Sequence, residues 1–195
     1  FYVQDPSTLM AVGLLDPRPG ERILDVCSAP GGKTLAIAAR MNNKGRVVAM
    51  DVLENRLDRS AQRLRRAGVH NVERRHLENE RDTWVKRHPG AFDRVLIDAP
   101  CTGVGTWRRH PDAKWRLAPG ALELRLREQA ALLEIALSGR AQLLVVTRLQ
   151  PLIDYLNSGR ARITDRVGFV SIESTGGCDA SQLRGELRRD RKSVV

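Results

Sequence analysis

Two short segments carry residue types that could bind a cofactor or attack a substrate. Residues 25–34 read Asp-Val-Cys-Ser-Ala-Pro-Gly-Gly-Lys-Thr, and their adjacent glycines would let a ligand approach the backbone at the start of a helix. Residues 98–103 read Asp-Ala-Pro-Cys-Thr-Gly, so that a thiol, Cys101, follows a proline. A cysteine can act as a nucleophile where its thiolate is stabilised, and Asp98 could orient the edge of a polar ring. The alternative is that Cys101 packs as a small apolar residue beneath the proline turn.

The glycine loop differs from the two common nucleotide-binding motifs. A P-loop ending in Gly-Lys-Thr needs a glycine five residues before Gly32, where this chain has Cys27. The dinucleotide fingerprint Gly-x-Gly-x-x-Gly is absent as well. Asp51 lies 20 residues after Gly31, at the end of an apolar run, where an acid can accept hydrogen bonds from the hydroxyls of a ribose. Loop and acid together predict a site for a nucleoside-bearing cofactor; the alternative is a tight strand-to-helix turn with a nearby acid.

A segment of basic and aromatic residues follows Cys101. Residues 106–116 interleave four Lys/Arg residues with two tryptophans. Basic groups can hold phosphates, and aromatic rings can stack on unpaired bases. We expect Arg108, Arg109 and Lys114 to contact RNA phosphates and Trp115 to pack inward. The alternative is an exposed loop whose tryptophans both pack inward.

Alternating strand and helix patterns must position these segments. The pattern predicts a doubly wound α/β fold with a mostly parallel, Rossmann-like sheet, because strands separated by helices join through right-handed crossovers. Ligands in this fold bind at the carboxyl ends of the strands. The expected strands are residues 22–26, 46–51, 69–74, 92–98 and 142–147, and the expected helices are residues 33–40, 53–64 and 122–137.

Composition limits the class of protein. The 195 residues include 33 Lys+Arg against 23 Asp+Glu, a formal charge of +10, which fits either a polyanionic partner or a solvated basic surface. No apolar run is long enough to span a bilayer, and the first residues are unlike a secretion signal. The three cysteines are far apart, so we expect no metal site, no disulfide framework and a cytoplasmic location. The chain begins without methionine, which is typical of a fragment.

The motifs together resemble those of the Sun/Fmu-type ribosomal RNA (cytosine-5) methyltransferases. The resemblance rests on residues 26–34, 98–101 and 108–112, with residues 2–5 (Tyr-Val-Gln-Asp) as a lead-in, and it covers residues 1–147. It implies S-adenosylmethionine as methyl donor, a cytosine in ribosomal RNA as acceptor, and an upstream RNA-binding region, which we expect this chain to lack. It also implies covalent catalysis, in which a cysteine adds to C6 of cytosine so that C5 can take the methyl group. The target base must be unpaired or flipped to reach such a site.

The resemblance also implies roles for individual residues. Asp51 would hold the ribose of the donor, and Asp98 would bind the edge of the cytosine near the reacting centre. Asn79 would face the adenine, although the family usually has aspartate there. The residues expected around the methionine end of the donor are Cys27, Ser28, Ala29, Pro30, Gly31, Gly32 and Lys33.

The chain departs from the family after the fifth expected strand. The family's nucleophile lies in a Thr-Cys-Ser sequence, whereas this chain has Thr147-Arg148, and arginine stays protonated and cannot add to a pyrimidine. Cys101 matches the cysteine that assists release in the family. Three readings stay open: a methyltransferase with a damaged sequence, a pseudoenzyme that binds donor and RNA, and an enzyme that uses Cys101 as its nucleophile, as DNA cytosine-5 methyltransferases use a Pro-Cys.

The remaining residues show no family pattern. Cys178 is the only later thiol, and its Gly-Gly-Cys-Asp surroundings do not match the missing motif. We therefore expect a methyltransferase core over residues 1–147 and an atypical tail over residues 148–195, as a truncated or frameshifted gene would produce. This hypothesis predicts a poorly packed tail, and an ordered hairpin in residues 160–195 would count against it.

Overall fold

A six-stranded parallel sheet forms the centre of the molecule. The computed structural model describes residues 4, 6–79, 82–103, 107, 110–138, 143–147 and 168–172. The strand order is β3-β2-β1-β4-β5-β6, and every neighbouring pair is parallel. This confirms the predicted doubly wound, Rossmann-like α/β fold. The strands are β1 (Arg22–Val26), β2 (Arg46–Asp51), β3 (Val72–His76), β4 (Arg94–Asp98), β5 (Leu143–Thr147) and β6 (Gly168–Ile172).

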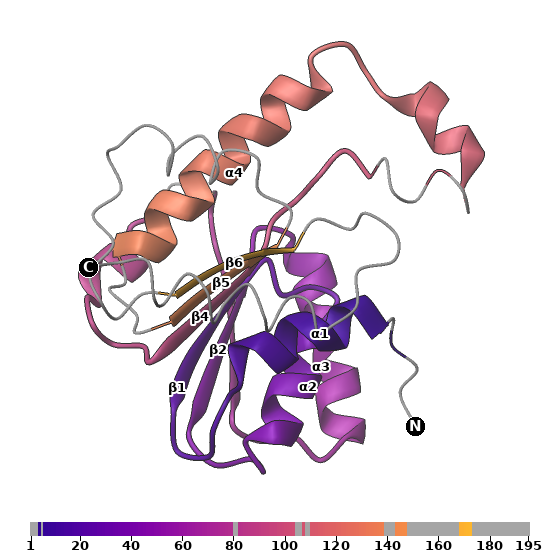
Figure 1. Ribbon diagram of the computed structural model, residues 1–195. Helices are drawn as coiled ribbons and strands as arrows, with labels where there is room; N and C mark the ends of the chain where they lie inside the picture. Colours follow the sequence, from indigo (N-terminus) through magenta and orange to yellow (C-terminus); the bar gives the residue numbers. More distant parts are fainter. Residues whose placement is uncertain are drawn as a thin grey trace, which may run out of the picture.

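Helices cover both faces of this sheet. Figure 1 shows α1, α2 and α3 on one side and α4 crossing the other side. The short 3-10 helix η1 packs beneath α4, and a second one, η3, precedes α4. No helix within the described part of the chain is long and apolar enough to cross a membrane. The helices are α1 (Pro6–Leu15), α2 (Gly32–Arg40), α3 (Glu54–Arg66), η1 (Val85–Arg87), η3 (Pro111–Arg116) and α4 (Ala121–Ser138).

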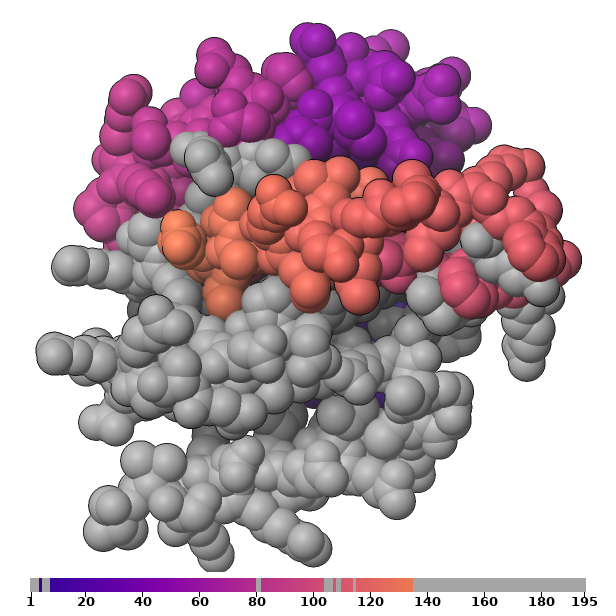
Figure 2. Space-filling view, turned by 90° about the horizontal axis from the view of Figure 1, so that it is seen from above, coloured from indigo at the N-terminus to yellow at the C-terminus, as the bar shows by residue number. Residues whose placement is uncertain are grey.

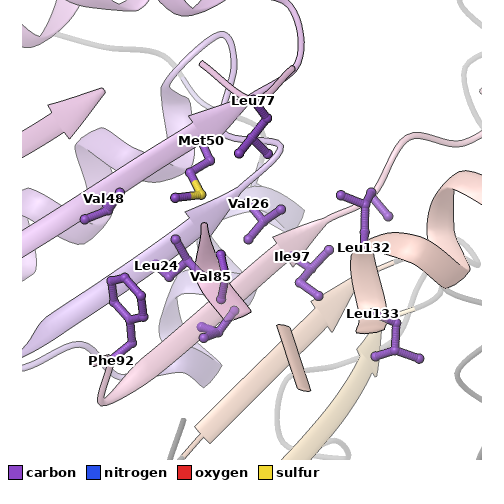
Figure 3. Close-up of a cluster of buried hydrophobic side chains, with 12 residues drawn as sticks. Leu24, Val26, Val48, Met50, Leu77, Val85, Phe92, Ile97, Leu132 and Leu133 are labelled. Carbon is purple, nitrogen blue, oxygen red and sulfur yellow. The ribbon is translucent and has the colours of Figure 1, made fainter. Parts of the chain in front are cut away.

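The apolar core consists of two clusters, one on each face of the sheet. Successive strand residues alternate between them, because side chains along a strand point to opposite faces. Ile23 of β1 and Leu96 of β4 pack toward α1 and α2, whereas Leu24 and Ile97 pack toward α4 and η1. Figure 3 shows the second cluster, in which Leu132 of α4 lies against the sheet. The central strands β1, β2 and β4 are therefore buried on both faces, which explains why their sequences are mostly apolar, whereas the edge strand β3 is polar and partly exposed.

The strand register brings the predicted site residues to one edge of the sheet. Val26 of β1 is level with Met50 of β2 and with Ile97 of β4. The next residues along these strands, Cys27, Asp51 and Asp98, therefore leave the sheet at the same level. This edge contains the carboxyl ends of the strands, where ligands bind in doubly wound folds.

The sheet continues beyond residue 147. β6 pairs in parallel with β5, with Thr147 level with Ile172. The described part of the tail is thus a parallel strand and not a hairpin. The proposed boundary at residue 147 and a non-native tail remain predictions.

Candidate functional site

The loop between β1 and α2 is held in a specific backbone conformation. The Ser28 amide donates a hydrogen bond to the Met50 carbonyl oxygen (2.9 Å), and the Gly31 amide donates to the Ser28 carbonyl oxygen (2.7 Å). Gly31 has a φ of +94°, and a Cβ there would lie 2.9 Å from the Cβ of Ser60. Only glycine meets both conditions without strain. The first predicted glycine thus sets the path of the loop against α3, and the second begins α2.

Asp51 ties two loops together. Its Oδ2 accepts a hydrogen bond from the Ala29 amide (3.0 Å), and its Oδ1 accepts one from the Leu53 amide (2.9 Å). The side chain is buried. Because each carboxylate oxygen can accept a second hydrogen bond, Asp51 keeps the capacity to bind hydroxyl groups while holding the glycine loop.

Lys33 and Asp98 form an ion pair that joins the two predicted functional segments. Their Nζ and Oδ2 atoms are 2.5 Å apart, and both side chains are mostly buried. Lys33 lies in the first turn of α2, and Asp98 ends β4. The sequence placed these residues in separate motifs 65 positions apart, and the fold brings them into direct contact.

A cavity of about 260 Å³ lies over these groups. It brings together most of the residues that the sequence predicted for the cofactor, but Gly31 and Asp51 do not line it. Asp51 adjoins the lining, because its carboxylate accepts a hydrogen bond from the amide of the lining residue Ala29. Asn79 is exposed in the turn after β3 and is also outside the lining. Three lining residues, Gln4, Thr8 and Asp25, were given no site role from the sequence, although Gln4 and Asp25 lie in the segments 2–5 and 25–34. The lining consists of Gln4, Thr8, Asp25, Cys27, Ser28, Ala29, Pro30, Gly32, Lys33 and Asp98.

Asp25 is a buried acid in the second-last position of β1. Its Oδ2 accepts a hydrogen bond from the Thr34 hydroxyl (2.6 Å), whereas Oδ1 accepts none from the described residues. Burial raises the pKa of Asp25 from 3.8 to about 7, against the opposing effects of Thr34 and Lys33. An acid inside an otherwise apolar strand run was the available sequence signal for this residue.

This buried carboxyl predicts a pH-dependent stability. The unfolded chain releases the Asp25 proton near pH 4, whereas the folded protein holds it up to about pH 7. The contribution of Asp25 to the free energy of unfolding is therefore fully present below about pH 4, and it is lost as the pH rises through 7. Asp25→Asn lacks this titration. The free energy of unfolding of the variant minus that of the wild type should therefore increase by up to about 4 kcal/mol between pH 4 and pH 8. Urea unfolding across this range measures the difference, and a constant difference would contradict the assignment.

Cys101 lies beside a second cleft. Cys101 and Thr102 line a cleft of about 380 Å³, together with residues 116–120 and the first residues of α4. The buried Gln129 of α4 donates a hydrogen bond from Nε2 to the Pro100 carbonyl oxygen (2.8 Å) and so holds this segment. Cys101 is half-buried and forms no disulfide with Cys27, the other cysteine in the described part of the chain. Its sulfur thus belongs to a segment that borders a cleft and is fixed by a helix.

The basic and aromatic segment differs from expectation at one tryptophan. Trp115 was expected to pack inward, and this is wrong, because its side chain is 81% exposed. The reason is that η3 lies on the surface, away from both core clusters, whereas Trp107 is half-buried. Arg108, Arg109 and the side chain of Lys114 lie outside the described residues.

Comparison with known proteins now identifies the family. The family model described as 16S rRNA methyltransferase RsmB/F matches residues 12–142, well over half of the chain. The chain belongs to this family. The ribosomal RNA small subunit methyltransferase B proteins of Yersinia pseudotuberculosis and Yersinia pestis are 47% identical to it over 113 residues. The matched part is 58% of this chain and 26% of each relative.

Solved structures agree with this family membership. NSun6 from Pyrococcus horikoshii with SFG has a TM-score of 0.71 and 26% identity, covering 90% of this chain and 47% of that one. A methyltransferase homolog protein from the same organism has a TM-score of 0.57 and 37% identity, covering 70% of this chain and 41% of that one. The predicted resemblance to the Sun-type methyltransferases is confirmed, and S-adenosylmethionine dependence follows from the family. The chain matches only about a quarter of the length of its curated RsmB relatives.

Proposed function

We propose that the protein transfers a methyl group from S-adenosylmethionine to C5 of a cytosine in ribosomal RNA. One observation carries this proposal. The short segment from Asp98 to Cys101 borders the glycine-loop cavity at its first residue and the second cleft at its last. Methyl transfer requires the donor and the acceptor base to be bound next to each other. Two cavities that border the same short segment could hold them in this way.

The residues around the glycine-loop cavity fit the proposed donor. The loop from Cys27 to Lys33 would hold the methionine end, and Asp51 would accept the ribose hydroxyls through its remaining lone pairs. The Ser28 hydroxyl is buried and has no hydrogen-bond partner among the described residues, so it can serve a polar ligand. Asn79 remains a weaker candidate for the adenine, because it is exposed and outside the cavity lining.

Cys101 is the proposed nucleophile of this chain. Its thiolate would add to C6 of the cytosine, which places electron density on C5. The donor, when bound, supplies the methyl group to C5. Loss of the C5 proton to a base then restores the double bond and expels the Cys101 thiolate. Asp98 would bind the edge of the base, while Lys33 keeps its carboxylate in place.

A second candidate function is binding of donor and RNA without methyl transfer. The observation that favours it is Arg148, which stands directly after Thr147 where the resemblance implies a nucleophilic cysteine. An RNA containing 5-fluorocytidine separates the two functions, because fluorine at C5 blocks the final proton loss and traps the covalent adduct. With donor present, we expect a denaturation-resistant complex of protein and RNA. Tight binding without any such complex would support the second candidate.

The basic segment, residues 106–116, is expected to contribute to RNA affinity. We expect the double variant Arg108→Ala and Arg109→Ala to bind ribosomal RNA more weakly. Each lost phosphate contact on single-stranded RNA should lower the slope of log affinity against log salt by about 0.7, or about 1.4 for the pair. Fluorescence anisotropy over a salt series measures this slope. An unchanged slope would assign the two arginines a role away from the RNA.

A further inference from the structure

We propose that the Cys101 cleft binds single-stranded RNA next to the target cytosine, with Trp115 stacking on a neighbouring base and Arg116 and Arg125 holding phosphates. This inference rests on the proposed function and adds the RNA-binding subsite to it. The Cys101 cleft is lined by Cys101, Thr102, Arg116, Leu117, Ala118, Pro119, Gly120, Ala121, Leu124 and Arg125.

The Cys101 cleft and the glycine-loop cavity border the same short segment of the chain. Cys101 forms part of the wall of the cleft and lies three residues after Asp98, which lines the glycine-loop cavity. Figure 1 shows that the N-terminal half of α4 and η3 extend beyond the carboxyl ends of the strands. Figure 2 shows this region projecting at one end of the surface that α4 crosses. A strand of RNA whose cytosine reaches Cys101 would therefore pass along this projection.

The side chains that line the cleft are both cationic and apolar. Two arginines and two exposed leucines, Leu117 and Leu124, line the same cleft. Residues 107–127 contain six Lys/Arg against two Asp/Glu, so the local charge is strongly positive. Mixed cationic and apolar surface suits a nucleotide, which has a phosphate and a flat apolar base face. This charge favours RNA over an apolar protein segment as the occupant.

Trp115 is an exposed aromatic residue next to the cleft lining in the sequence. It directly precedes Arg116, and its side chain is 81% exposed. An indole costs free energy when it is held in water, and a stacked base would cover it. Arg116 pairs with Asp112, but both side chains are mostly exposed, so a phosphate can replace this weak surface pair. Arg125 pairs with Glu128 through Nη1, so its remaining guanidinium N–H groups would hold the phosphate.

The test uses two short single-stranded RNAs, each with one cytosine. In the second RNA, the nucleotides on either side of the cytosine are abasic. Trp115→Ala should weaken binding of the first RNA by about tenfold or more, and binding of the abasic RNA by less than about twofold. Leu122→Ala is the matched control, because Leu122 is an exposed apolar residue nearby that does not line the cleft. It should bind both RNAs as the wild type does.

The arginines are tested by salt dependence. Arg116→Ala and Arg125→Ala should each lower the slope of log affinity against log salt by about 0.7, whereas Arg127→Ala, outside the cleft lining on the same helix, should leave it unchanged. Equal effects of Trp115→Ala on both RNAs, or unchanged slopes for both cleft arginines, would overturn the inference. If such variants still methylate ribosomal RNA with wild-type affinity, only the inference fails. Absence of RNA binding by the wild type would overturn the proposed function as well.

Discussion

Replacing Cys101 by alanine is expected to abolish methyl transfer to RNA and the trapped adduct with 5-fluorocytidine RNA. The reason is chemical, because C5 of cytosine is a poor nucleophile until a thiolate has added to C6. Loss of a covalent nucleophile should lower the rate by at least about a thousandfold. Labelled methyl incorporation and denaturing electrophoresis of the RNA complex measure the two effects.

Two controls make this result specific to the Cys101 sulfur. Cys178→Ala removes another thiol of the chain, whose surroundings match no family motif, and should leave both activities intact. Calorimetry should show unchanged affinity of Cys101→Ala for S-adenosylmethionine, because Cys101 does not line the glycine-loop cavity. If Cys101→Ala retains the adduct while Cys178→Ala loses it, the nucleophile has been assigned to the wrong cysteine.

The second large effect is expected at Asp51. Asp51→Ala should weaken binding of S-adenosylhomocysteine by about 10- to 100-fold, because the ribose loses a charged acceptor and the Ala29 and Leu53 amides lose theirs. The variant should also bind the 2′-deoxyribose analogue no more weakly than the parent compound, whereas the wild type should prefer the parent. Isothermal titration with both ligands measures this preference.

A matched control separates ribose binding from general destabilisation. Asp58 lies on α3, and its exposed carboxylate pairs with Arg74 away from the cavity. Asp58→Ala should therefore keep the wild-type affinity and the preference for the complete ribose. If Asp51→Ala still prefers the complete ribose, then Asp51 supports the loop without touching the ligand.

The fold could be predicted because its central strands β1, β2 and β4 are buried on both faces. Apolar runs such as residues 22–26 and 94–98 have few other stable placements, and their order along the chain sets the crossovers. Helix α1 escaped prediction because apolar residues occur on all its sides, which removes the helical periodicity. The third strand begins three residues later than expected, since only tertiary pairing with β2 defines its ends.

The site could be predicted only where its residues form local motifs. The glycine loop and the Asp98–Cys101 segment are contiguous in sequence, and each leaves the sheet at the same edge. Contacts between distant segments, such as Lys33 with Asp98, depend on strand register and lack a local signal. The exposure of Trp115 depends on where η3 lies relative to the core, which composition cannot indicate.

The most direct test of the proposed activity is mass spectrometry of ribosomal RNA after incubation with the protein and isotopically labelled S-adenosylmethionine. Small-subunit ribosomal RNA without this modification is the substrate, and its nucleosides are analysed after digestion. The proposed function predicts labelled 5-methylcytidine, which disappears with Cys101→Ala. Saturable binding of both donor and RNA with no labelled 5-methylcytidine would contradict it and would identify a protein that binds both without transferring the methyl group.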